Sequence, residues 1–119
     1  MGPVSWDGAQ RSRIGAMESE VLDLGEMVCV RHHIPAGFDS ALYRGLPDDM
    51  CPCEHWCFLV RGRLRCRFIG GETNEVEAGD AFHLRAGHLA DVFEDAELIE
   101  FTAADDYRLK AEHLARSAT

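Results

Sequence analysis

Between residues 21 and 101 the sequence is a series of short apolar segments separated by residues that favour turns. In the clearest of them, Arg63–Ile69, arginines alternate with Leu64, Cys66 and Phe68. Strict alternation of this kind predicts a strand with one buried and one solvated face. Short strands at this spacing predict an all-β sandwich or barrel. The other strands are expected over Val21–Ile34, with a turn at Gly25, and over Ala81–Arg85, Leu89–Phe93 and Ala96–Phe101.

The segment after Arg63–Ile69 predicts a hairpin. The turn Gly70-Gly71-Glu72 leads to Glu75-Val76-Glu77, whose two glutamates lie on the face opposite Val76. Opposite charges across an antiparallel pair attract, so we expect these glutamates to pair with the arginines. We interpret the arginine stripe as the solvated face of a strand rather than as an anion or nucleic-acid site.

The two ends of the chain differ from this pattern. Residues 1–18 are rich in Gly, Ser and Arg, and we expect a flexible arm there, with Trp6 against the body. Residues 19–119 then form a single domain. A helix is predicted over Thr102–Arg116, begun by a capping box between its first residue and Asp105. Its apolar positions at helical spacing are Tyr107, Ala111 and Leu114.

Composition limits the classes of function. A length of 119 residues with 46% hydrophobic and 28% charged side chains fits one globular domain. The net charge of −9 argues against nucleic-acid binding and against docking on anionic membranes. No apolar run approaches the length of a membrane span, and the N-terminus lacks the apolar segment of a secretory signal. Four of the five cysteines lie within Cys51–Cys66, which indicates free or metal-bound thiols and a cytoplasmic location.

The stretch Asp49–Gly62, DMCPCEHWCFLVRG, carries the strongest chemical signal. If it is extended, alternate side chains share a face, and Trp56 lies on the opposite one. Thiols and an imidazole on one face indicate a metal site or a reactive thiol. The alternative is a set of buried core thiols, because free cysteine is among the most buried residue types. The residues of the shared face are Cys51, Cys53, His55 and Cys57.

Two motifs in this chain resemble those of the cupin superfamily. The first ends at Gly62, which six residues separate from His55, and the apolar run Phe58-Leu59-Val60 precedes its turn. The second begins at Gly79-Asp80 and continues through Arg85-Ala86-Gly87 to His88. The chain is similar in particular to short bacterial cupins with a Gly-Leu-Pro-Asp-Asp stretch and a Cys-x-Cys-x-His-Trp core, here Gly45–Asp49 and Cys51–Trp56. The resemblance implies a single jelly-roll β-barrel with a C-terminal helix outside it.

The resemblance also shows where the chain departs from a common cupin metal site of three histidines and one glutamate. Those positions fall on Asp49, Cys51, His55 and Ala90 here. A substitute set is Cys51, His55 and His88, with Cys53 or Asp49 as a fourth ligand. Three protein ligands with one open position suit a catalytic zinc or iron site, and a thiolate shifts the preference toward zinc or copper. No nucleotide cofactor is expected.

The fold implies chemistry on a small molecule inside the barrel, of the lyase, isomerase, cyclase or oxygenase type. His55 and His88 are the predicted proton carriers, because imidazole titrates near neutral pH. His33, Tyr43 and Arg44 are predicted substrate contacts. Two alternatives stay open, a non-catalytic module that binds or senses a soft metal or small ligand, and a structural unit whose cysteines are core. A homodimer is implied by the resemblance, and neither a nucleic acid nor a membrane is expected as a partner.

Overall fold

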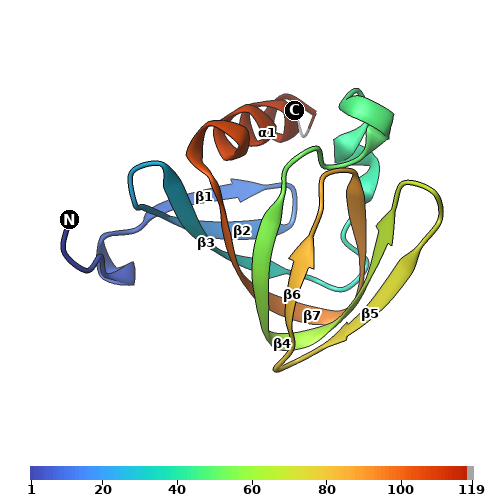
Figure 1. The fold of residues 1–119 in the computed structure, drawn as a ribbon, viewed down its shortest axis with the longest axis horizontal. Helices are drawn as coiled ribbons and strands as arrows, with labels where there is room; N and C mark the ends of the chain where they lie inside the picture. The colour runs from blue at the N-terminus through green and yellow to red at the C-terminus, as the bar shows by residue number, and fades with distance from the viewer. Residues whose placement is uncertain (118–119) are drawn as a thin grey trace.

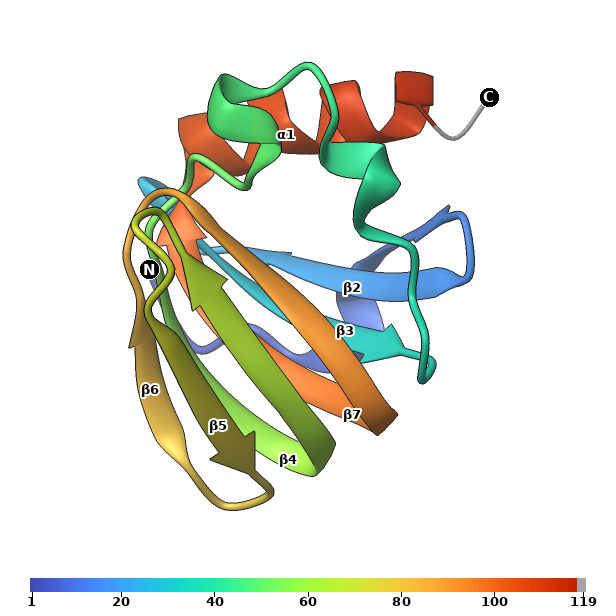
Figure 2. The same ribbon diagram turned by 90° about the vertical axis from the view of Figure 1, so that its right-hand side faces the viewer.

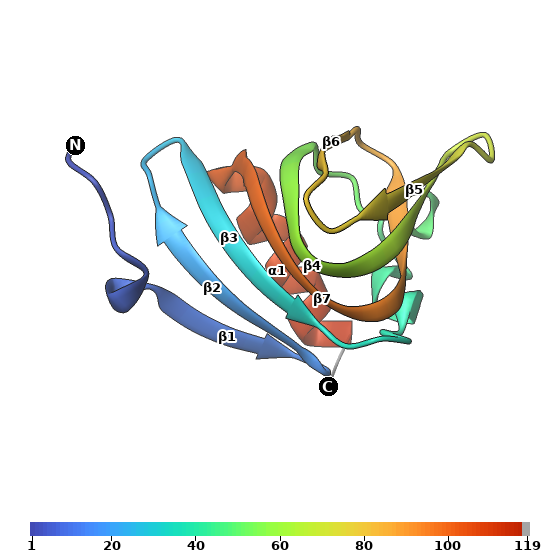
Figure 3. The same cartoon turned by 90° about the horizontal axis from the view of Figure 1, so that it is seen from below.

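The computed structural model describes residues 1–117, which form seven strands and a C-terminal helix around one core (Figure 1). The hydrogen-bonded order of the strands is β1-β2-β3-β7-β4-β5, and β6 pairs with β4. The sheet bends so that β1, β2 and β3 stand opposite β5 and β6, and we call the space between them the interior (Figures 2 and 3). The strands are β1 (Gln10–Ile14), β2 (Met17–Asp23), β3 (Met27–Ile34), β4 (His55–Phe68), β5 (Thr73–Glu77), β6 (Ala81–Leu84) and β7 (His88–Ala103). The helices are the short 3-10 turns η1 (Trp6–Gly8), η2 (Ser40–Tyr43) and η3 (Pro47–Asp49), and the α-helix α1 (Ala104–Ser117).

This arrangement confirms the predicted all-β jelly roll with a C-terminal helix, but the sheet is not closed. Within residues 1–117, β1 and β5 stand at the two ends of the strand order instead of pairing with each other. The Val21–Ile34 region is two strands joined at Gly25, as expected, with β2 paired to β3.

Strand β4 runs unbroken through Gly62, where the sequence predicts a turn. Its register with β7 shifts between Leu59 and Leu64, which is the signature of a bulge. Gly62 has φ of 99°, and a Cβ there would lie 2.6 Å from the Asp95 carbonyl oxygen. The buried positions change phase at this point, because a bulge shifts the alternation by one residue. They are His55, Cys57 and Leu59 before it, and Leu64, Cys66 and Phe68 after it.

The hairpin of β4 and β5 has the predicted register, with Arg65 opposite Glu75. The predicted cross-strand ion pairs are wrong, because the arginines pair instead with a carboxylate on the other neighbouring strand. Arg65 and Arg67 donate to Asp91 of β7 at 3.2 and 2.9 Å. Asp91 lies directly opposite Arg65 in the β4–β7 register, so it reaches both guanidinium groups.

Residues 10–18 belong to the sheet rather than to a flexible arm. They form β1 and the start of β2, a hairpin whose end buries Ile14 and Met17 in the core. The predicted contact of Trp6 with the body is confirmed, since the Arg31 guanidinium lies 4.5 Å from the centre of its ring. Alternation in Gln10–Ile14 is weak because these side chains are mostly exposed, which is why the pattern reads as an arm.

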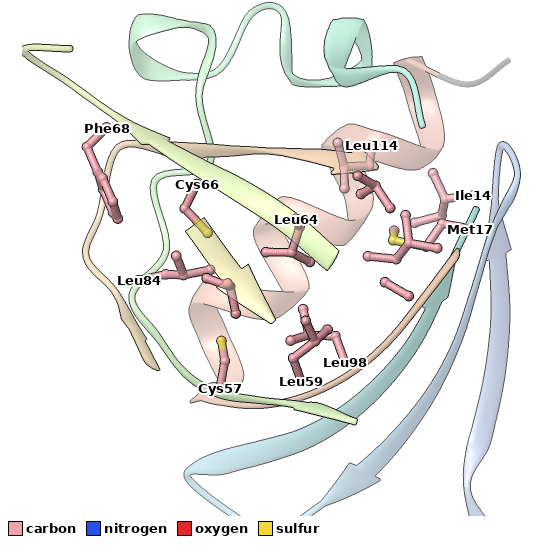
Figure 4. Packing of buried hydrophobic residues seen from close by; sticks show 14 residues of the cluster. Ile14, Met17, Cys57, Leu59, Leu64, Cys66, Phe68, Leu84, Leu98 and Leu114 are labelled. Carbon is pink, nitrogen blue, oxygen red and sulfur yellow. The ribbon is translucent and has the colours of Figure 1, made fainter. Parts of the chain in front are cut away.

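The core fills the interior and is closed at one end by α1 (Figures 2 and 4). Leu59, Leu64 and Leu114 are its most buried large side chains, and Leu114 comes from α1. The predicted capping box is wrong. Thr102 is still in β7, because pairing with β3 continues to Ala103, and its hydroxyl donates to the Glu54 carbonyl oxygen at 2.9 Å.

Candidate metal centre

Three side chains with metal-ligating atoms meet in the interior. Cys51 lies just before β4, His55 is the first residue of β4, and His88 is the first residue of β7. One ligating atom from each lies within 4.8 Å of the others. The structure therefore brings together the three residues that the sequence predicts as metal ligands.

The main chain fixes this meeting. Cys51 and His88 form an isolated antiparallel bridge, in which the Cys51 N–H donates to the His88 carbonyl oxygen at 2.9 Å. The Gly87 N–H donates back to the Cys51 carbonyl oxygen at 2.8 Å. Gly87 has φ of 83°, a conformation that glycine adopts without strain, so the second motif turns its histidine toward the first.

The shared face predicted for this stretch is confirmed by burial. Cys51, Cys53, His55 and Cys57 are all buried, whereas Trp56 is 48% exposed on the other side. Residues 51–54 are not in a strand, so an irregular extended segment is enough to keep the alternation.

His55 and His88 each have a partner at Nδ1, the ring nitrogen that faces away from the cluster. The His88 Nδ1–H donates to the Arg85 carbonyl oxygen at 2.8 Å, which leaves Nε2 with its lone pair. His55 Nδ1 lies 2.6 Å from Glu100 Oε2, in a contact whose direction suits an ion pair better than a hydrogen bond. His55 Nε2 lies 3.4 Å from Cys51 Sγ. This is how proteins orient histidines that bind metals, because the outer acceptor sets the tautomer.

Glu100 of β7 is a member of this site that sequence reasoning missed. Its side chain is buried, with one carboxylate oxygen on His55 and the other on His32 Nε2. His32 Nδ1 in turn contacts the Ser19 hydroxyl at 2.6 Å. Burial would raise the pKa of Glu100, but His55, Lys110 and His32 outweigh it and hold that pKa well below its ordinary value. The sequence did contain a signal for Glu100, because it is an acidic residue at an inward-facing position of an apolar strand.

The thiol of Cys51 is held in its ligand form. The neighbouring Cys53 thiol is the largest influence that lowers the pKa of Cys51, and Lys110, His55 and His88 add to it against the effect of burial. Burial would also lower the pKa of His55, but Glu100 raises it above its ordinary value, with help from Cys51. Both shifts favour the charged forms, the thiolate of Cys51 and the imidazolium of His55.

The structure does not bring the other predicted residues to the cluster. Asp49 is exposed, and its carboxylate accepts from the Gly45 N–H at 2.9 Å. Cys53 lies beside the cluster, with Sγ 3.3 Å from the Asp106 carbonyl oxygen. His33 alternates with buried His32 and lies on the outer face of the sheet, near Glu20 and Glu97. Tyr43 packs partly buried against the core, and Arg44 is exposed.

His83 lies on the surface, as the sequence predicts. Its Nε2 is 2.7 Å from Glu54 Oε2, and its ring stacks on Trp56 with centres 5.3 Å apart. These contacts on the outer face hold the strand whose inner face carries His55, since Trp56 and His83 are opposite in the β4–β6 register.

The donor set fits a soft divalent metal. Thiolate and imidazole ligands suit zinc or copper, and three protein ligands leave one coordination position for water or substrate. The three ligand atoms lie within 4.8 Å of one another and could hold a metal ion, and each histidine of the cluster has an outer acceptor. Manganese prefers carboxylate and water ligands, which this cluster does not supply from Cys51, His55 and His88.

No family model matches this chain, and no curated protein matches it either. Among solved structures it is similar to an RmlC-like cupin from Shewanella frigidimarina NCIMB 400, with 16% identity over 87% of this chain and 93% of that one, at a TM-score of 0.65. It is also similar to the oxalate decarboxylase of Lactobacillus farciminis, described as a formate complex, with 14% identity, 87% and 34% coverage and a TM-score of 0.58.

A third similar structure is the Bacillus subtilis oxalate decarboxylase, a protein described as having Mn(II) centres, with 14% identity, 87% and 30% coverage and a TM-score of 0.59. This chain spans about a third of the length of the two decarboxylases. Among residues 1–117 there is no helix both long and apolar enough to cross a membrane. The strand order, the two motifs and these three likenesses together show that this chain has the cupin fold.

Proposed function

We propose that this protein binds a divalent transition metal, zinc by preference, through Cys51, His55 and His88, and that the centre acts on a small molecule. The observation that carries the proposal is the outer acceptor on each histidine, Glu100 for His55 and the Arg85 carbonyl for His88. Both acceptors take up Nδ1 and direct Nε2 into the cluster, where Cys51 Sγ lies 3.4 Å from His55 Nε2. A buried histidine that only fills the core does not need its Nε2 directed at a cysteine sulfur by an acceptor on Nδ1.

A bound metal would supply Lewis acidity for polarising a carbonyl or stabilising an enolate. The chain itself must hold the ligands and move protons. His55 and His88 are the predicted carriers, and with both of them on the metal, His32 beside Glu100 is the remaining imidazole in contact with the network. Proton-transfer chemistry of the lyase or isomerase type is therefore the reaction class that these residues support best.

A second candidate is a non-catalytic module that captures or senses a soft metal. The observation that favours it is burial, because Cys51 is 1%, His55 3% and His88 5% exposed. Cys53 lies close enough to influence Cys51, so a thiol is available beside the cluster. A fourth position filled by protein favours sensing, whereas an exchangeable water there favours catalysis.

The test is the metal content of protein purified without a chelating column, followed by cobalt substitution. We expect wild-type protein to bind one zinc per chain, and the cobalt form to show thiolate-to-cobalt charge transfer. Cys51→Ser should lose the charge-transfer band, and His55→Ala and His88→Ala should lose most of the metal. Cys57→Ala and His83→Ala are matched controls, because they remove a buried thiol and an imidazole outside the cluster.

Two results would contradict the proposal. One is full metal content in Cys51→Ser and both histidine variants. The other is wild-type protein that takes up no zinc or cobalt while its thiols stay unreactive in the folded state. Exchange of water on the cobalt form, measured by relaxation of solvent protons, separates the catalytic from the sensing candidate. Homodimerisation stays a prediction, which sedimentation velocity tests, and the exposed outer-face aromatics Trp56, Phe58 and Phe101 are where a second copy would pack.

A further inference from the structure

Lys110 is the only lysine among the 12 Lys and Arg residues of the chain, and it is buried. Its side chain is 5% exposed, although lysine is among the residue types least often buried. Burying an ammonium is costly unless other groups compensate for its lost hydration. The position of this one lysine therefore needs an explanation from its surroundings.

The helix α1 presents Lys110 toward the metal centre. Asp106 lies one turn earlier on the same helix face, and its carbonyl oxygen is 3.3 Å from Cys53 Sγ. Lys110 Nζ lies 5.2 Å from the centre of the Tyr107 ring. Burial would lower the pKa of Lys110, but Glu100 and then Cys51 raise it above its ordinary value, so the group is an ammonium.

The Lys110 ammonium has no hydrogen bond and no ion pair with any residue in 1–117. Glu100 is not its direct ion-pair partner, because the close contacts of that carboxylate are with His32 and His55. An ammonium carries three donors. A buried cation with free donors beside a metal cluster is one half of a site for an anion, with the attraction of Glu100 and Cys51 acting only at longer range.

The charges of the loaded centre lead to the same conclusion. A divalent metal and the Lys110 ammonium together exceed the negative charges of Glu100 and the Cys51 thiolate by one, with the histidines neutral as ligands. One monoanion would neutralise the centre. The centre is also small and closed, since Cys51, His55, Glu100 and Lys110 are each at most 5% exposed, so the ligand must be small.

We propose that Lys110 binds the carboxylate of a small monocarboxylate ligand beside the Cys51–His55–His88 metal site. This inference rests on the proposed function and names the substrate class of that site. A carboxylate suits both the Lys110 ammonium and the metal, because it accepts hydrogen bonds from an ammonium and its oxygens are ligands for divalent metals. A neutral molecule of the same shape would leave the ammonium uncompensated.

The single lysine makes the test direct. Protein grown with ¹³C,¹⁵N-lysine and loaded with zinc has one labelled side chain, whose Cε and Nζ signals belong to Lys110. We expect acetate to shift these signals saturably, and acetamide and chloride to leave them unchanged. On the cobalt form, Lys110→Met should keep the metal and weaken acetate binding at least tenfold, roughly the loss of one charge-assisted hydrogen bond. Lys110→Arg should restore most of that affinity.

The outcomes separate the two proposals. Zinc-loaded wild-type protein whose lysine signals ignore acetate overturns the role of Lys110 and leaves the metal site standing. Equal acetate affinity in Lys110→Met does the same. An equal response to chloride overturns the carboxylate class. Wild-type protein that binds no zinc overturns the proposed function and this inference with it. If Lys110→Met fails to fold, the lysine signals of the wild-type protein decide alone.

Discussion

His55 Nδ1 and Glu100 Oε2 lie 2.6 Å apart, and the two side chains are 3% and 4% exposed. The second oxygen of the same carboxylate contacts His32, so one buried acid holds two imidazoles from two other strands. This pairing sets which nitrogen of His55 faces Cys51 and His88. The chemistry of the site therefore depends on Glu100, which contacts none of the atoms that would bind the metal.

Replacing Glu100 by Gln should weaken zinc binding without removing a ligand. The amide keeps the shape but loses the charge that fixes the His55 tautomer, and loss of such a partner typically costs about 10–100-fold in metal affinity. Competition with a chromophoric chelator measures the change. Glu97→Gln is the matched control, because Glu97 lies on the same strand and its side chain faces His33 on the outer face. Equal zinc affinity in wild type and Glu100→Gln would show that Glu100 does not orient the ligand.

Cys66 should make the protein less stable in alkali. Burial, followed by the nearby Asp91, raises the pKa of this thiol to about 12. The unfolded thiol ionises near pH 8.5, so above that pH the unfolded state loses a proton that the folded state keeps. The free energy of unfolding then falls as pH rises toward 12, by about 1.4 kcal/mol per pH unit for one thiol.

Cys66→Ala lacks this proton, so its stability should fall more slowly than that of the wild type above pH 9. Urea unfolding of both proteins between pH 6 and pH 11, with reductant present, measures the difference. Between pH 6 and pH 8 the two curves should be parallel, since neither state ionises the thiol there. Parallel curves over the whole range would mean that Cys66 keeps an ordinary pKa in the fold.

Gly62→Ala should be among the most damaging substitutions of a small residue. Its φ of 99° disfavours any L side chain, and the new Cβ would lie 2.6 Å from a main-chain oxygen and 2.8 Å from the Ala96 Cα. We expect a loss of roughly 3 kcal/mol or more in unfolding free energy, from strain plus the clash. Gly79→Ala is the control, because its φ of 96° carries the same strain with no atom within 4 Å. Similar losses in both variants would show that the close approach of β7 is unimportant.

Local patterns were enough to predict strand structure after residue 20, the inward face of Cys51–Cys57 and the meeting of His55 with His88. Those features depend on neighbouring residues and on two short motifs. The same patterns missed β1, and they divided β4 at Gly62 and β7 into two strands each, whereas both run unbroken. The ion pairs of Arg65 and Arg67 were mispredicted because β4 has a neighbour on each side, and the sequence shows only the one that follows it. The capping box at Thr102 failed for a similar reason, since pairing with β3 extends β7 through that residue.

Glu100 and Lys110 could not be assigned from the sequence because their roles arise from contacts far along the chain. An acid in a strand and a lysine in an amphipathic helix are ordinary when seen locally. They become parts of a site only when β7 and α1 close over Cys51 and His55. The sequence does hold one trace of this, a lysine alone among arginines.

The bulge at Gly62 determines which side chains in the second half of β4 face the core. The strand contributes inward side chains at odd positions before the bulge and at even positions after it. Leu59 and Leu64 are an odd number of positions apart, so only the bulge lets both inward runs face the core. If β4 became a regular strand with its length unchanged, Arg65 and Arg67 would turn into the core while Cys66 and Phe68 turned to solvent. The backbone at Gly62, rather than any side chain of β4, therefore determines which half of the following residues the core receives.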